Sequence, residues 1–79
     1  MLYYPYMASN DNEISKKIGE NIKRVRESQN LTQEDVAKEA KMTANYFAKI
    51  ERGTIGTAPE KIYKIIKALK VKASEIFPS

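Results

Sequence analysis

The stretch that decides the fold is Leu31-Thr-Gln-Glu-Asp-Val-Ala-Lys-Glu-Ala-Lys-Met-Thr-Ala-Asn-Tyr-Phe-Ala-Lys-Ile-Glu-Arg-Gly53. Thr32, followed three residues later by Asp35, forms a capping box, which predicts a short helix that ends near residue 39 or 40. Thr43 predicts the cap of a second helix over about residues 44–52, and Gly53 provides the positive-φ residue that ends it. The stretch therefore predicts two short helices joined by a tight turn at residues 41–42, with their axes near a right angle.

A longer helix is predicted upstream of this stretch. Four apolar residues recur there at intervals of four, four and three, and they form one stripe along a helix: Ile14, Ile18, Ile22 and Val25. The stripe predicts a helix over about residues 11–29. Asn10 or Asp11 can cap its start, and Asn30 can take the left-handed conformation that ends it.

Two further helices are predicted downstream. Thr57-Ala58-Pro59-Glu60 has the pattern of a second capping box, with proline in the first turn of a helix that runs to about Lys70. Ser74 is expected to cap a final turn over residues 75–77, which Pro78 stops. No stretch alternates with period two, so we expect an all-α, compact five-helix domain. The expected inward side chains of the two short helices and of the helix after them are Val36, Ala37, Ala40, Phe47, Ile50, Ile62, Ile65, Ile66 and Leu69.

The composition argues against catalysis. The chain has 79 residues, enough for one domain, and contains neither cysteine nor histidine. Disulfides, thiolate nucleophiles and metal sites built on Cys or His are therefore excluded, and the usual general base is missing. We expect a protein that is not an enzyme and uses no cofactor and no metal. The net charge of +4 suits a polyanionic partner such as nucleic acid.

The first nine residues differ from the rest. They carry no charge and hold three of the five tyrosines together with Pro5, which argues against a helix at that point. We interpret residues 1–9 as a flexible or docked arm and residues 10–79 as the domain. The N-terminus lacks the basic region and apolar core of a secretory signal, and no apolar run is long enough to span a bilayer. The expected location is cytoplasmic, on the nucleoid when the protein is bound to DNA.

At this point the sequence resembles a known family. The run from Leu31 to Ala40, followed by Ile50-Glu51-Arg52-Gly53, is similar to the Cro/lambda-repressor-type (XRE-like) helix-turn-helix family. The segments Ile22-Lys-Arg-Val-Arg26 and Leu69-Lys-Val71 also fit, so the resemblance covers residues 13–77. In size the chain resembles restriction–modification controller proteins and small phage-type repressors. Many members have glycine in the turn where this chain has Lys41.

The resemblance implies a lambda-repressor-like fold and specific roles for matching residues. Base contacts are implied for the outward N-terminal face of the second short helix: Ala44, Asn45 and Lys49. Phosphate contacts are implied at the starts of both short helices: Gln33, Thr43 and Tyr46. A structural ion pair between the upstream helix and the end of the second short helix is also implied: Arg26 and Glu51.

The residue types suit these roles chemically. The Asn45 amide offers the donor and acceptor that pair with adenine, and Lys49 can reach guanine O6 or N7 from one turn later. The Ala44 methyl group can contact a thymine methyl group. Arg52 and the loop that begins at Thr54 suit phosphates.

Each role has a purely structural alternative. Thr32 and Thr43 cap helices whether or not they also contact a phosphate. Tyr46 can pack its ring on the turn, while Asn45 and Lys49 can be ordinary exposed polar residues. The five lysines of residues 61–72 are most simply a solvated face.

These observations predict a sequence-specific transcriptional regulator that binds double-stranded DNA. One such domain contacts few base pairs, so we expect a homodimer on a pseudo-palindromic operator, with half-sites about 34 Å apart. The expected dimer contact uses exposed apolar residues near the C-terminus: Ile65, Leu69, Val71, Ile76 and Phe77. The alternative is a protein-interaction module, such as an antitoxin or a coactivator-like partner, that uses the same fold and its tyrosine-rich arm.

Overall fold

The structure, a computed structural model, describes the backbone of residues 5–78 and the side chains of residues 13–78. It contains four α-helices: α1 (Pro5–Ser28), α2 (Gln33–Glu39), α3 (Ala44–Arg52) and α4 (Pro59–Leu69). A short 3₁₀ turn, η1 (Ala73–Glu75), follows them, and no strand is present within residues 5–78. The all-α prediction is confirmed. The prediction of a fifth helix is wrong, because the C-terminal segment forms only a three-residue 3₁₀ turn without a side-chain cap at its start.

The α1 helix is longer than the apolar stripe indicated. It begins at Pro5, so the predicted start near residue 11 and the predicted caps at residues 10 and 11 are wrong. Proline fits the first turn of a helix, because its missing N–H has no partner there in any case. Residues 5–9, which we expected in the arm, thus belong to α1. Residues 1–4 lie outside the described part, and a docking role for the arm stays a prediction.

The caps around α2 and α3 follow the local sequence. Thr32 accepts a hydrogen bond from the Asp35 backbone N–H, and Thr43 accepts one from the Tyr46 backbone N–H, so both predicted caps are confirmed. Gly53 ends α3 at φ 70°, as predicted. Lys41 adopts φ 60° in the turn, a left-handed conformation that costs a non-glycine residue about 1 kcal/mol.

The predicted capping box before α4 is wrong. The N-cap falls on Ala58, and no side chain bonds to the first-turn N–H groups. The helix begins with Pro59 in its first turn, which moves the N-cap one residue beyond Thr57. Proline still starts the helix, because its φ is fixed near the helical value.

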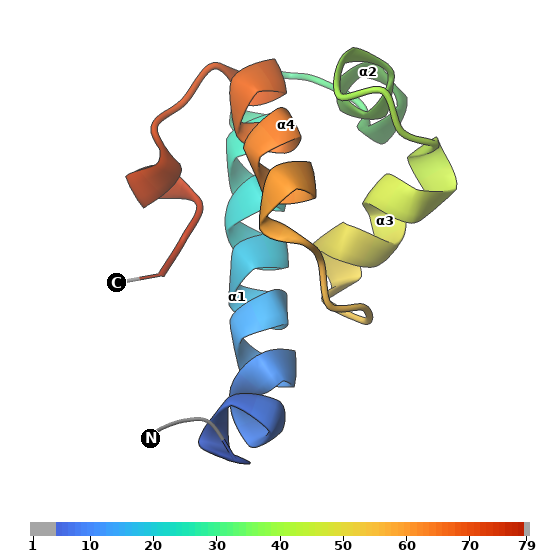
Figure 1. The fold of residues 1–79 in the computed structure, drawn as a ribbon. Helices are drawn as coiled ribbons and strands as arrows, with labels where there is room; N and C mark the ends of the chain where they lie inside the picture. Colours follow the sequence, from blue (N-terminus) through green and yellow to red (C-terminus); the bar gives the residue numbers. More distant parts are fainter. Residues whose placement is uncertain (1–4, 79) are drawn as a thin grey trace.

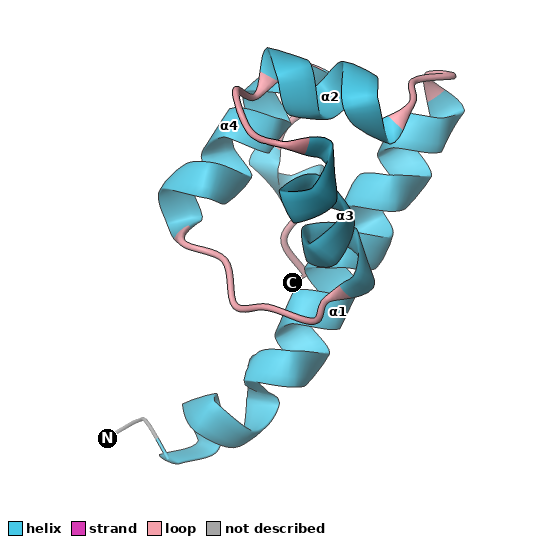
Figure 2. Ribbon diagram, turned by 90° about the vertical axis from the view of Figure 1, so that its right-hand side faces the viewer, coloured by secondary structure: helices cyan, strands magenta, loops and turns pink. Residues whose placement is uncertain are grey.

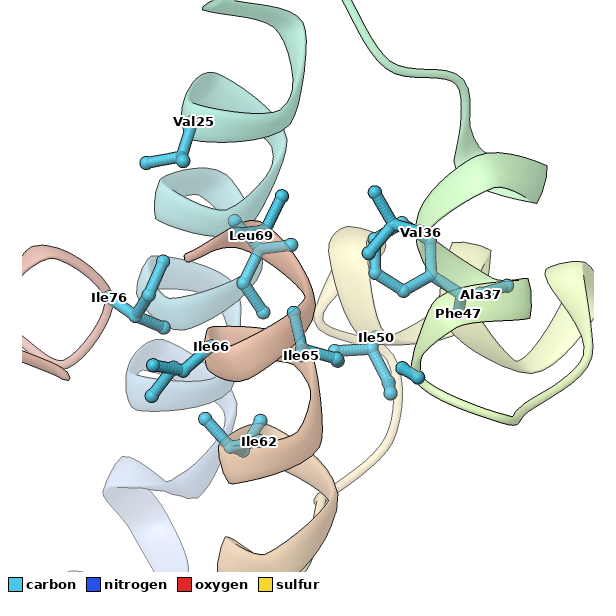
Figure 3. Close-up of a cluster of buried hydrophobic side chains, with 12 residues drawn as sticks. Val25, Val36, Ala37, Phe47, Ile50, Ile62, Ile65, Ile66, Leu69 and Ile76 are labelled. Atoms are coloured by element: carbon cyan, nitrogen blue, oxygen red, sulfur yellow. The ribbon is translucent and has the colours of Figure 1, made fainter. Parts of the chain in front are cut away.

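One apolar core lies where the four helices meet (Figure 3). The α4 helix runs beside α1, while α2 and α3 pack across the upper part of this pair (Figure 1). All of the predicted inward side chains of α2, α3 and α4 are buried. Within the predicted α1 stripe, Ile22 and Val25 are buried, Ile18 is half-buried against the core, and 42% of the Ile14 surface is exposed. The core consists of Ile22, Val25, Val36, Ala37, Ala40, Phe47, Ile50, Ile62, Ile65, Ile66, Leu69 and Ile76.

Two glycines allow α1 and α3 to touch through their backbones. A Cβ added at Gly19 would lie 2.5 Å from the carbonyl oxygen of Ile50 and even closer to that of Glu51. A Cβ added at Gly53 would lie 2.5 Å from the Cα atom of Lys16. The crossing therefore fixes how α3 projects from the domain. None of the helices in the described part of the chain is long and apolar enough to cross a membrane.

Candidate nucleic-acid interface

The α3 helix presents a polar face on the outside of the domain. It lies in front of the other helices when the molecule is viewed from the right-hand side of Figure 1 (Figure 2). Phe47 and Ile50 hold its inner face in the core, which leaves Asn45 and Lys49 exposed. Because these two residues are four positions apart, their side chains share one face of the helix. The core thus positions a donor–acceptor amide and an ammonium group side by side.

Two other predicted DNA-contact residues are less exposed to solvent. Ala44 and Tyr46 are half-buried, and both pack against the core. Ala44 begins α3, so part of its methyl group still reaches the surface beside Asn45. The packing of Tyr46 against the core agrees with the structural alternative, in which its ring packs within the domain. The base contact of Ala44 and the phosphate contact of Tyr46 stay predictions.

A buried ion pair joins α1 to the end of α3. The Arg26 Nε donates to Glu51 Oε2 at 2.6 Å, and Arg26 Nη2 donates to Glu51 Oε1 at 3.2 Å. This two-point contact confirms the implied pair. The third nitrogen, Nη1, donates to the carbonyl oxygen of Leu31 at 2.8 Å. Hydrogen bonding to Glu51 raises the pKa of Arg26 above its ordinary value, so the Arg26 guanidinium stays charged despite burial.

The same carboxylate also holds α2. Gln33 Nε2 donates to Glu51 Oε1 at 2.9 Å, so one acceptor group joins the start of α2 to the end of α3. Sequence analysis missed this bond, because no local pattern links residues 18 positions apart. This bond uses one of the two amide hydrogens of Gln33 and leaves the other hydrogen and the amide oxygen for other partners. It does not test the predicted phosphate contact of Gln33.

The start of α2 has its own polar support. The Thr32 backbone N–H donates to Asp35 Oδ2 at 2.9 Å, and the Asp35 backbone N–H donates to Thr32 Oγ1 at 3.0 Å. The pKa of Asp35 is lowered, first by the backbone hydrogen bond that its carboxylate accepts from Thr32 and then by the Thr32 side chain. The start of α2 is therefore fixed locally by this capping box, and the Gln33 bond to Glu51 joins it to the end of α3.

The segment after α3 places two further predicted phosphate ligands on the surface. Arg52 is exposed in the last turn of α3, and Thr54 is exposed just beyond Gly53. The Thr54 hydroxyl donates to the Lys49 carbonyl oxygen at 3.3 Å, so it also closes the end of the helix. Thr43, also exposed, lies at the other end of α3, so exposed polar residues stand at both ends of the helix that carries Asn45 and Lys49.

Comparison with known proteins agrees with this geometry. Residues 22–76 match the family described as helix-turn-helix. The chain belongs to this helix-turn-helix family of DNA-binding regulators. It is 35% identical over 66 residues to the control protein C.BamHI of Bacillus amyloliquefaciens, a match that covers 82% of each chain.

Two solved structures of controller proteins have a similar fold. The restriction–modification controller protein C.AhdI of Aeromonas hydrophila gives a TM-score of 0.76 at 27% identity, over 80% of this chain and 96% of that one. A mutant of the restriction–modification controller protein C.Esp1396I gives 0.73 at 27% identity, over 76% of this chain and 78% of that one. The resemblance to this type of helix-turn-helix protein is thus confirmed.

Most of the residues predicted at the dimer contact are buried in the core of the domain itself. Ile65, Leu69 and Ile76 are fully buried, so the expectation that they are exposed at a dimer contact is wrong. The C-terminal segment folds back on α1, where Asn21 Nδ2 donates to the Ile76 carbonyl oxygen at 2.7 Å. Val71 is half-buried and packs against the core. The large apolar side chains that remain exposed among the described residues are Ile14, Tyr63 and Phe77.

Proposed function

We propose that this protein is a sequence-specific transcriptional regulator that inserts α3 into the major groove of double-stranded DNA. The proposal depends above all on the exposure of Asn45 and Lys49 on one face of α3. A helix can read bases only if its orientation is fixed. Here the opposite face of α3 is buried in the core, and its C-terminal turn is held through Glu51.

In this arrangement Asn45 and Lys49 supply the sequence preference. The Asn45 amide can accept from adenine N6 and donate to adenine N7, and the Lys49 ammonium can donate to guanine O6 or N7. Ala44 can contact a thymine methyl group. Residues around the edge of the face would bind phosphates and set the register, although they carry no base preference themselves. These are Gln33, Thr43, Tyr46, Arg52 and Thr54.

We further propose that the protein acts as a homodimer on a pseudo-palindromic operator. A single domain reads few base pairs, and a second copy doubles the number read. The two recognition helices would enter half-sites about 34 Å apart on one side of the duplex. Phe77, 39% exposed, and half-buried Val71 are the members of the predicted contact that retain accessible surface.

The proposal is tested by selecting binding duplexes from a random-sequence library and measuring affinity by fluorescence anisotropy. The selected duplex should bind much more tightly than a scrambled duplex of the same composition. Asn45→Ala should lower the preference for the selected duplex by about 5- to 150-fold, because one good side-chain–base pair contributes about 1–3 kcal/mol of discrimination. Lys49→Ala should do the same at another base pair.

Lys17→Ala is the matched control, because Lys17 is an exposed lysine on α1 that takes no part in the α3 face. It should leave the ratio of the two affinities unchanged. A library that yields no enriched sequence, or equal binding of both duplexes by native protein and variants, would contradict the proposal. Sedimentation at increasing operator concentration tests for two protein chains per duplex.

A further inference from the structure

The positive charge of the protein is concentrated in one segment. Residues 61–72 contain five lysines and no acidic residue, whereas the whole chain has a net charge of +4. The rest of the chain therefore carries a net charge of −1. The unit that is proposed to read DNA, residues 31–53, contains four basic and four acidic residues and is neutral. Long-range attraction to a polyanion thus has to come from outside the α2–α3 unit.

These lysines gather beside the end of α2. Lys64 and Lys67 of α4 line a hollow together with Lys41 of the α2–α3 turn, and all three are exposed. The other residues that line it are Glu39, Ala40 and Ala68. When α3 faces the viewer, α4 lies to one side of it and farther back, so α3 does not cover it in this view (Figure 2). We call the exposed and half-exposed lysines of this region the lysine surface: Lys41, Lys61, Lys64, Lys67 and Lys70.

Two of these lysines occupy strained backbone positions. Lys41 has φ 60° and Lys70 has φ 59°, and the remaining non-glycine residue with positive φ in the described part is Asn30. Glycine would adopt both lysine conformations without strain, and asparagine would do so at little cost. Backbone energetics therefore give no reason for lysine at either position. The dipole of α4 favours a lysine at position 70, and a use for the ammonium group gives a reason for lysine at position 41.

Ordinary stabilisation does not explain the whole surface. A lysine near a helix C-terminus interacts favourably with the helix dipole, which accounts for Lys67 and for Lys70. Lys61, in contrast, lies in the first turn of α4, where a positive charge is unfavourable. Within residues 13–78 the ion pairs all involve Arg26, so no carboxylate neutralises the lysine surface by direct contact. Lys67 lies 5.5 Å from the centre of the Tyr63 ring, which leaves its charge intact.

From this charge distribution, we propose that the lysine surface is a second, sequence-independent contact for the phosphate backbone of DNA, separate from the face of α3. The inference rests on the proposed function, since it takes the polyanion to be the DNA that α3 reads. The neutral α2–α3 unit supplies base preference, and the lysine surface supplies attraction through release of counterions from DNA. Affinity and specificity are then carried by different helices.

The test compares two double variants on a scrambled duplex between 50 and 200 mM salt. Lys64→Gln/Lys67→Gln removes two charges from the lysine surface. Lys17→Gln/Arg24→Gln removes two exposed charges from α1 as the matched control. Two lost phosphate contacts reduce the slope of log K against log salt by about 1.8, so native protein should lose about 12-fold more affinity over this range than the α4 variant. The control should keep the native slope.

Lys41→Gly separates a binding role from a structural one. Glycine relieves the strain at φ 60°, so the melting temperature should rise while the salt slope falls by about 0.9. A native slope in the Lys64→Gln/Lys67→Gln variant, or equal losses of slope in that variant and the control, would overturn the proposal. Poly-glutamate that binds the lysine surface while the DNA slope is unaffected would also overturn it, in favour of an acidic protein partner.

Failure of this inference is distinguishable from failure of the proposed function. The lysine variants should weaken binding to selected and scrambled duplexes by the same factor, which leaves the preference unchanged. Asn45→Ala should change the preference and leave the salt slope unchanged. A protein that shows no preference for any duplex but retains the slope difference would contradict base reading alone.

Discussion

Replacing Gly19 by alanine should destabilise the protein, although alanine is the better helix former by about 1 kcal/mol. The added Cβ would lie 2.5 Å from the carbonyl oxygen of Ile50 and 2.8 Å from the carbonyl carbon of Glu51. Both are backbone atoms of α3, which cannot rotate away as a side chain could. The two helices must therefore separate, and the core between them must loosen.

The size of the effect follows from two destabilising contributions and from the helix propensity of alanine, which partly offsets them. Overpacking of a core costs about 1–3 kcal/mol. Separation of α1 from α3 also stretches the buried Arg26–Glu51 pair, and complete loss of one partner of such a pair costs about 3–5 kcal/mol. Partial loss of the pair, combined with overpacking and offset by helix propensity, gives a net destabilisation of about 2–4 kcal/mol. For a chain of this size that lowers the melting temperature by about 10–25 °C.

Thermal unfolding followed by circular dichroism measures this change, and Gly56→Ala provides the control. A Cβ at Gly56 would meet no atom within 4 Å, and the position has no positive φ. This control should therefore be neutral, or more stable by up to about 1 kcal/mol. If Gly19→Ala melts at or above the native temperature, helix propensity dominates and the close contact of α1 with α3 is refuted.

Three further predictions concern the polar groups that hold α2 and α3. Arg26→Met or Glu51→Leu alone should destabilise by about 3–5 kcal/mol, whereas the double variant should lose much less, because neither buried charge is left unpaired; urea unfolding in a double-mutant cycle measures this, and additive losses would contradict it. Thr43→Ala should cost about 1 kcal/mol through loss of the α3 cap, with exposed Thr54→Ala as a comparison that should cost less in the same unfolding experiment. The Asp35 carboxylate, whose pKa is lowered in the folded protein, should stabilise it at pH values above the unfolded pKa of about 3.9, and this contribution should disappear as pH falls through the folded pKa. Asp35→Asn should remove the contribution of this carboxylate to the loss of stability in acid. If the variant and the native protein lose the same stability between pH 5 and pH 2, the predicted role of Asp35 is wrong.

The sequence by itself determined the central unit of the fold. The α2 and α3 helices begin and end where their caps predicted, because a cap is a bond between residues three positions apart and needs no tertiary partner. The exposed face of α3 followed for a similar reason, since the 3.6-residue period places Asn45 and Lys49 opposite Phe47 and Ile50. Three local predictions still failed. Pro5 starts α1, Ala58 rather than Thr57 precedes α4, and Lys72 rather than Ser74 precedes the final turn.

The tertiary structure decided which apolar residues remain available and which polar groups act together. Ile65, Leu69 and Ile76 have the same chemistry as an interface, and only the packing of the C-terminal segment shows that the domain buries them in its own core. The bond between Gln33 and Glu51, the contact at Gly19 and the hollow lined by Lys41 and two α4 lysines likewise join residues far apart in sequence. Such contacts leave no periodic signal, because their spacing along the chain is set by the paths of the connecting segments. They appear only when the helices are placed against one another.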